Sequence, residues 1–166
     1  CDRSAESAAA VGADLGLTDD EYDGRAADLL DPDGAAAWRD AVVERFGRVD
    51  ALVHLVGGWR GGTPLAEAPL ADWDLLHDLL IRTVQNTTRA FHGDLVGSGR
   101  GRFVLVSARQ AQEPTDDNAA YAAAKAAAEA WTLALADGFT GTGATANIVV
   151  VEAILTPAMR AENPDE

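Results

Sequence analysis

The chain is poor in residues that cross-link a protein, anchor it in a membrane or contact anions. Its 166 residues include one cysteine, Cys1, which excludes an internal disulfide and favours a reducing compartment such as the cytoplasm. No apolar run approaches the roughly 20 residues that a membrane-spanning helix needs. Acidic residues outnumber basic ones by 27 to 13, and the net charge of −14 argues against binding to nucleic acids or anionic membranes.

Lysine is as rare as cysteine, because twelve of the 13 basic residues are arginines and Lys125 is the only lysine. It follows Tyr121 by four positions, and residues four apart lie on one face of a helix. An ammonium beside a phenol can stabilise the phenolate and lower the tyrosine pKa, so that the tyrosine transfers protons near neutral pH. The alternative is an alanine-rich helix that carries the two residues by coincidence.

Helix and strand patterns alternate along the chain. Helices are predicted at 4–16, 35–46, 70–92 and 119–137, and strands at 24–30, 49–56, 102–107 and 145–151. The last three strands are mainly apolar, which is typical of a parallel sheet covered on both faces. The sequence therefore predicts one α/β domain over residues 1–166, with a doubly wound parallel sheet and a polar tail at 157–166 that we expect to be frayed.

The order and spacing of several motifs resemble the short-chain dehydrogenase/reductase family over nearly the whole chain. The motifs are Gly47-Arg48-Val49-Asp50-Ala51-Leu52-Val53, Gly101-Arg102-Phe103-Val104-Leu105-Val106-Ser107, Tyr121 with Lys125, and the run from Asn147 to Pro157. The resemblance implies a Rossmann-type fold. It also indicates that these residues start near the end of the family's second strand, without the first strand, the glycine-rich turn and the first helix.

The activity that this resemblance implies is NAD(P)-dependent oxidation or reduction of an alcohol/carbonyl pair in a small-molecule substrate. Tyr121 would be the acid/base, Lys125 would tune it and contact the cofactor ribose, and Ser107 would be the oxyanion donor. No metal is implied, and the three histidines have no spacing typical of metal ligands.

The same resemblance assigns cofactor contacts to residues along the chain: Asp2, Asp28, Leu29, Gly57, Lys125 and Thr156. Asp2 would bind the ribose, which favours NAD over NADP without settling the choice. Asp28 and Leu29 would meet the adenine. Because the glycine-rich turn holds the pyrophosphate in the family, we expect weak dinucleotide binding from these residues alone.

Several family positions carry other residues here. The Asn-Asn-Ala-Gly motif reads His54-Leu55-Val56-Gly57, the helix asparagine falls on Leu80, the second serine after the fifth strand falls on Ala108, and the Pro-Gly beside the nicotinamide falls on Val151-Glu152. Alanine has no donor for an oxyanion, and losing such a donor costs on the order of 10²–10³ in rate. A one-residue shift in the 109–118 loop would bring Ser107 into the serine role.

These departures leave other functions open. One alternative is a non-catalytic dehydrogenase-like scaffold that pairs with a homologous subunit, and another is a lyase or isomerase that uses Tyr121 without hydride transfer. His54 lies either in the pocket or in the core as a hydrogen-bonded histidine. Arg109 either holds an anionic substrate or is a surface charge. The sequence does not name the substrate.

The family commonly forms dimers through two helices, so the resemblance implies a homo-oligomer through helices 70–92 and 119–137. A stripe of small residues in the second helix, Ala122, Ala126, Ala130 and Ala134, favours close helix packing. Phe91, Trp131 and Phe139 add aromatic bulk nearby. The alternative is that the alanine stripe packs on the chain's own sheet.

Overall fold

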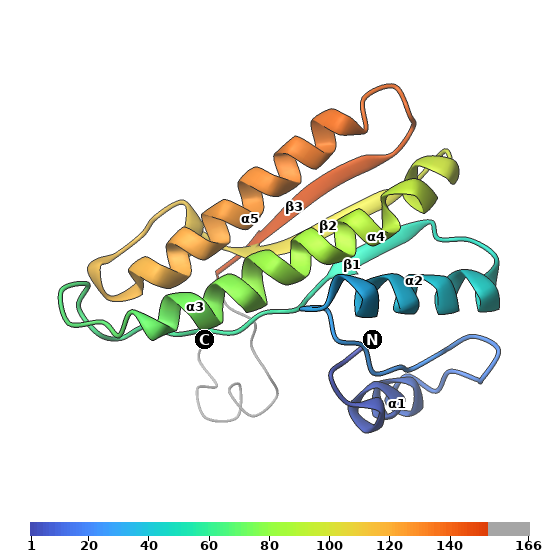
Figure 1. The fold of residues 1–166 in the computed structure, drawn as a ribbon, viewed down its shortest axis with the longest axis horizontal. Coiled ribbons are helices and arrows are strands. Elements are labelled where there is room, and N and C mark those ends of the chain that lie inside the picture. Colours follow the sequence, from blue (N-terminus) through green and yellow to red (C-terminus); the bar gives the residue numbers. More distant parts are fainter. Residues whose placement is uncertain (153–166) are drawn as a thin grey trace, which may run out of the picture.

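A parallel sheet of three strands forms the centre of the computed structural model, which describes residues 1–152 (Figure 1). The strands are β1 (Ala51–His54), β2 (Arg102–Ala108) and β3 (Thr145–Val151), in that order across the sheet. The predicted strand at 24–30 is wrong, because the segment makes only an isolated parallel bridge between Asp2 and Ala26. The Asp28 carboxylate accepts a hydrogen bond from the Leu30 N–H (3.0 Å) and turns the chain there.

Within residues 1–152, five α-helices and one π-helical turn accompany the strands. They are α1 (Ala5–Asp14), α2 (Pro32–Phe46), α3 (Ala71–His77), η1 (Asp78–Arg82, the π turn), α4 (Thr83–Gly97) and α5 (Ala119–Gly138). The predicted helix 70–92 thus corresponds to α3, η1 and α4, and it continues past Gly93 because Leu95 is fully buried in the core. The predicted loop 109–118 contains two short 3₁₀ turns, η2 (Arg109–Ala111) and η3 (Asp116–Asn118).

The ends of α2 follow from local sequence. Asp31 caps the first turn by accepting from the Asp33 N–H (3.1 Å), and Pro32 occupies the position where no N–H is needed. Gly47 ends the helix at a φ of 78°, a left-handed conformation that glycine adopts without strain. The chain then enters β1.

Helices α2, α4 and α5 pack on one face of the sheet and enclose the main core (Figure 1). Alternate strand residues point toward these helices, among them Leu52, Phe103 and Leu105. Their neighbours point to the other face, where Val53 and Val149 are 54% and 47% exposed within the described residues. No helix of residues 1–152 is long and apolar enough to cross a membrane.

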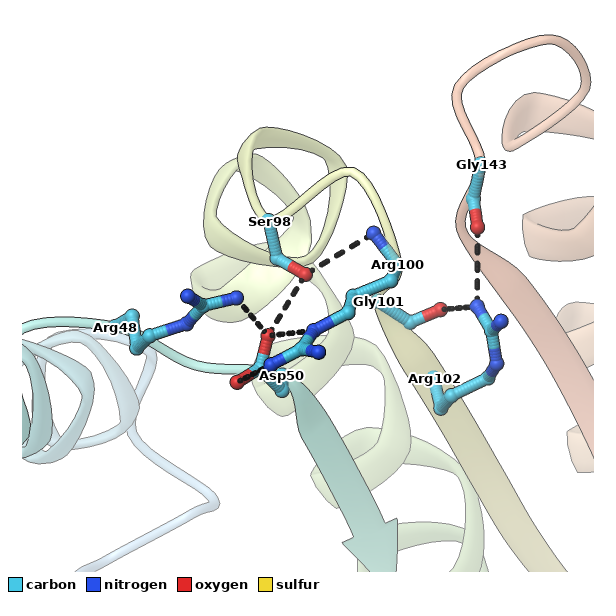
Figure 2. A network of polar contacts seen from close by, with 7 residues as sticks. All are labelled: Arg48, Asp50, Ser98, Arg100, Gly101, Arg102 and Gly143. Atoms are coloured by element: carbon cyan, nitrogen blue, oxygen red, sulfur yellow. Dashed lines mark hydrogen bonds and ion pairs between the residues drawn. The ribbon is translucent and has the colours of Figure 1, made fainter.

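A network of charged side chains joins the start of β1 to the turn between α4 and β2 (Figure 2). The Asp50 carboxylate accepts from Arg48, from the Ser98 hydroxyl (3.1 Å) and from Arg100 (3.3 Å). The hydrogen bond from Arg48, followed by that from Arg100, lowers the Asp50 pKa from 3.8 to about 2. These contacts fix the N-terminal end of the sheet.

At the same end of the sheet, Arg102 joins the turn before β2 to the turn before β3 (Figure 2). Its guanidinium donates to the carbonyl oxygens of Gly101 (2.8 Å) and Gly143 (3.0 Å). Gly143 has a φ of 81°, and a Cβ there would lie 2.3 Å from the Gly99 carbonyl oxygen. The turns before β2 and β3 therefore touch in a way that only glycine permits.

Candidate active site

Tyr121 and Lys125 lie on one face of α5, as their four-residue spacing predicts. The structure places Lys125 above the C-terminal end of β2. The Lys125 ammonium is 5.9 Å from the centroid of the Tyr121 ring. The Lys125 side chain is largely covered, and its Nζ donates to the Val106 carbonyl oxygen (3.0 Å). The pairing of β1 with β2 ends one residue earlier, at His54 and Leu105. Lys125 thus binds β2 just beyond the end of the β1–β2 ladder.

Burial shifts the proton equilibria of both residues toward their neutral forms. Desolvation raises the pKa of Tyr121, and desolvation lowers the pKa of Lys125, against an opposing effect of Glu129. The expectation that Lys125 lowers the Tyr121 pKa is not met in this geometry. The ammonium is directed at the Val106 backbone, and burial is the one cause that moves the tyrosine.

The walls around Tyr121 are apolar. Leu80, at the position of the family's helix asparagine, lies in the π turn and packs with Leu76, Ile81 and Ala124 in a small cluster that Tyr121 covers. π turns often occur at functional sites. The Leu80 side chain cannot form a hydrogen bond. The π turn therefore desolvates Tyr121 and Lys125 and offers them no polar partner at this position.

Gly57 brings the loop after β1 close to the lysine. A Cβ at this position would lie 3.1 Å from Leu80 Cδ2 and 4.0 Å from Lys125 Nζ. Any larger residue would therefore have to displace Leu80. The absence of a side chain lets the backbone pass directly beside the ammonium.

His54, at the end of β1, is a hydrogen-bonded core histidine, one of the two alternatives that the sequence left open. Its Nε2 lies 3.1 Å from Thr83 Oγ1, and its Nδ1 lies 3.4 Å from Thr87 Oγ1. Burial, followed by the charge of Lys125, lowers the His54 pKa to about 4. The imidazole is therefore neutral at physiological pH.

Ser107 points into the core beneath α5. It is 1% exposed, and its hydroxyl donates to Glu129 Oε1 at 2.6 Å. The next residue, Ala108, ends β2 at the position of the family's second serine. Sequence reasoning missed Glu129, although it lies four residues after Lys125 and so extends the same helical stripe.

The residues expected to meet the adenosine part of a dinucleotide come together on the side of β1 opposite Lys125. Asp2 exchanges backbone hydrogen bonds with Arg25 and Ala27, each 3.0 Å long, which places it beside the segment leading to Asp28 and Leu29. The Asn86 amide donates to the carbonyl oxygen of Leu29 (2.9 Å). No sequence pattern pointed to this buried asparagine. Thr156 lies outside the described residues.

The remaining charged candidates bind one another. Arg109 forms hydrogen bonds with Glu113 (2.8 and 3.2 Å), and its Nη1 lies 3.5 Å from Glu152 Oε1. Both carboxylates raise the pKa of Arg109. Arg109 therefore serves here as an exposed partner of two acids. Within residues 1–152, no group of three or more His, Cys, Asp or Glu is placed to hold a metal ion.

Comparisons with known proteins agree with this arrangement. A family model described as short chain dehydrogenase matches residues 1–166. A D-threitol dehydrogenase from Mycolicibacterium smegmatis is 30% identical over 155 residues, which cover 93% of this chain and 59% of the relative. A 2,3-dihydroxy-2,3-dihydro-p-cumate dehydrogenase from Pseudomonas putida is 34% identical over 133 residues, covering 79% and 50% respectively. The chain thus spans between half and three fifths of the length of these curated relatives.

Solved structures extend the match to the fold. A metagenomic short-chain oxidoreductase in complex with NADP superposes with a TM-score of 0.80 at 26% identity, covering 92% of this chain and 69% of that chain. A gluconate 5-dehydrogenase from Burkholderia cenocepacia, in complex with NADP and tartrate, gives a TM-score of 0.84 at 24% identity, covering 99% and 64%. The Rossmann-type arrangement predicted from the sequence is confirmed, and the chain belongs to the short-chain dehydrogenase family.

Proposed function

We propose that the protein is a cytoplasmic NAD(P)-dependent oxidoreductase that interconverts an alcohol and a carbonyl compound. The observation that carries this proposal is the placement of Tyr121 and Lys125 on one face of α5, at the C-terminal end of the sheet. Ligands of open α/β sheets bind outside this end of the strands. Family membership supplies the reaction class, and the relatives' names supply candidate substrates.

Tyr121 would transfer the proton of the reaction. Its hydroxyl would donate to the carbonyl oxygen during reduction and accept from the alcohol during oxidation. Lys125, when protonated, would favour the phenolate that forms after donation. The apolar cluster around Leu80 would exclude water from this proton transfer.

The residues present fit a nicotinamide dinucleotide in part. Gly57 leaves open the space that a side chain would fill beside Lys125, and the bridge between Asp2 and Ala26 places Asp2 beside the segment that leads to Asp28. When bound, the cofactor supplies or receives the hydride. Asp2, Asp28, Leu29, Gly57 and Lys125 would hold it, and Asp2 favours NAD. We expect the 166 residues alone to bind NADH or NADPH more weakly than low micromolar, measured by quenching of tryptophan fluorescence.

The test measures hydride transfer by the full protein. The absorbance of the reduced nicotinamide monitors the reaction. The substrates are threitol, acetoacetyl-CoA and a cyclic cis-dihydrodiol, chosen from the names of relatives. Tyr121→Phe should lower kcat/KM by about 10²–10⁴ because the general acid is lost. Tyr22→Phe is the matched control, since Tyr22 bonds to Ala8 far from Lys125. Equal activities of the two variants would refute the role of Tyr121.

A second candidate function is the non-catalytic scaffold. Ala108 and Leu80 favour it, because neither offers the hydrogen bond that the family's serine and asparagine supply. On this alternative, the full protein binds a homologous subunit and shows no hydride transfer with any of the three substrates. Activity that Tyr121→Phe abolishes would exclude it.

We also propose that the protein is a homo-oligomer through the outer faces of α4 and α5. A groove of about 480 Å³ separates the two helices, with Arg89, Trp131 and Leu135 among its lining residues. The residues of the alanine stripe differ in burial: Ala122 is buried and Ala126 is half-covered, whereas Ala130 and Ala134 are exposed. Phe91 and Phe139 lie in the chain's own core and contribute nothing to an interface.

Light scattering on the full protein tests this assembly. We expect a multiple of the monomer mass, and a folded Ala126→Arg variant should shift toward the monomer because the charge would be buried. A monomeric unmutated protein would contradict the proposal. An unchanged mass of the variant would place the interface elsewhere.

A further inference from the structure

Glu129 occupies the helical stripe of α5 that carries Tyr121 and Lys125, one turn further along. Its carboxylate accepts a hydrogen bond of 2.6 Å from the hydroxyl of Ser107, and that hydroxyl is almost completely buried. A hydroxyl–carboxylate bond of this length is charge-assisted and strong. The carboxylate is thus held on the inner side of the helix rather than extended into solvent.

Two consecutive residues of β2 hold two consecutive turns of α5. The Val106 carbonyl oxygen accepts from Lys125 Nζ, and the Ser107 side chain donates to Glu129. The strand therefore fixes where the ammonium and the carboxylate lie relative to each other. Because both bonds join the helix to the end of β2, neither charged side chain can change rotamer without losing its partner on the strand.

We propose that Glu129 is a positioning residue of the proposed active site: its carboxylate, anchored by Ser107, keeps the buried Lys125 charged. A cation that leaves water loses solvation free energy, and a nearby fixed anion compensates part of that loss. The inference rests on the proposed function only in calling the site active. The electrostatic coupling of Glu129 to Lys125 stands independently of catalysis.

The other titratable groups that face Lys125 among the described residues do not supply a negative charge. His54, from β1, acts on the lysine as a neutral imidazole near pH 7, because burial holds its pKa near 4. Tyr121 is neutral because burial raises its pKa. Burial lowers the pKa of Lys125 and Glu129 raises it, so the carboxylate is the group that opposes loss of the proton.

The proposal also gives Ser107 a role. Its single hydroxyl proton is engaged by Glu129, so the side chain holds the carboxylate instead of donating to a substrate oxygen. Ser107 and Glu129 then form one unit that acts on Tyr121 through Lys125. Neither residue needs to touch substrate.

The experiment measures the titration of Lys125 directly in the full protein. Competitive acetylation by trace acetic anhydride at a series of pH values reports the fraction of free amine, and mass spectrometry identifies the peptide that contains Lys125. It is the only lysine of these 166 residues, so the assignment is unambiguous. In Glu129→Gln the midpoint should move to lower pH, and acetylation at pH 8 should rise by at least about threefold.

Glu113→Gln is the matched control, because it removes one negative charge from the exposed pair with Arg109. It should leave the Lys125 midpoint unchanged. Ser107→Ala should move the midpoint in the same direction as Glu129→Gln but less far, and Glu129→Asp should restore part of the shift. A role in folding alone would lower the melting temperature without moving the midpoint.

An unchanged midpoint in folded Glu129→Gln would overturn the proposal. If that variant does not fold, an unchanged midpoint in Ser107→Ala would overturn it equally. The readout needs neither cofactor nor substrate, so it is distinguishable from failure of the proposed oxidoreductase activity. A shifted midpoint in an inactive protein would support the coupling and contradict only the activity.

Discussion

The two ends of the sheet differ in how exposed their titratable side chains are and in what those side chains bind. At the N-terminal end, Asp50 and its two arginine partners are all at least a third exposed and bind one another. At the C-terminal end, His54 and Lys125 are buried and bind neutral oxygen atoms of threonine and backbone. The first arrangement joins strands to turns, and the second holds titratable groups in a poorly solvated place.

The difference shows in which protonation state each end favours. The pKa of Asp50 and that of His54 both fall, yet with opposite consequences: Asp50 is kept ionised by arginines, whereas His54 is kept neutral by burial. Groups whose proton equilibria are shifted by burial cluster at functional sites. The contrast therefore points to the C-terminal end as the place where proton chemistry can occur.

Among the variants that compare the two ends, the largest effect is expected from adding a hydroxyl at the C-terminal end of the sheet. Ala108→Ser, at the end of β2, should raise kcat/KM of the full protein about tenfold to a hundredfold, because it supplies the oxyanion donor that alanine lacks. Ala51→Ser, at the start of β1, should leave activity unchanged. Steady-state kinetics with the best of the three substrates measures both, and an absent gain in Ala108→Ser would show that the oxyanion is stabilised by other groups.

A smaller effect is expected on the pH dependence of stability. The His54 pKa is lowered from 6.5 to about 4 in the folded protein, so the unfolded chain binds more protons between these values. Stability is full above pH 6.5 and falls as the pH drops toward 4, by about 3 kcal/mol. Urea unfolding across this range measures the loss.

His54→Asn is the matched variant, because it removes the titrating group and restores the family's residue. Its stability should vary much less between pH 6.5 and 4 than that of the unmutated protein. His77→Asn, on α3, is the control. An equal slope in all three proteins would mean that other groups cause the pH dependence.

The smallest effect is expected at the N-terminal end. Asp50 has a lowered pKa, so its ion pairs contribute stability above pH 3.8 that is lost as the pH falls toward 2. Asp50→Asn should remove this contribution, and the difference from the unmutated protein should shrink in high salt because exposed pairs are screened. Melting temperatures at low and high ionic strength, at pH 7, test it. A salt-independent difference would indicate lost hydrogen bonds instead.

Local patterns were sufficient for much of the fold. The apolar runs of β1, β2 and β3 and the stop at Gly47 depend on short-range chemistry, and each was predicted close to its observed place. The predicted strand at 24–30 failed because a strand exists only with a paired neighbour, which the sequence pattern does not report. The helix boundary near Gly93 failed because burial of Leu95 outweighs the low helix propensity of glycine.

The candidate site shows the same division between features set by local sequence and features set by long-range packing. The sequence by itself determined that Tyr121 and Lys125 share a helix face, because a four-residue spacing fixes this in any α-helix. Only the tertiary structure decided what surrounds them: the strand oxygen that binds Lys125, the threonines that enclose His54, and the serine that holds Glu129. These contacts join segments distant in sequence, and the burial that shifts their proton equilibria arises when the helices pack on the sheet.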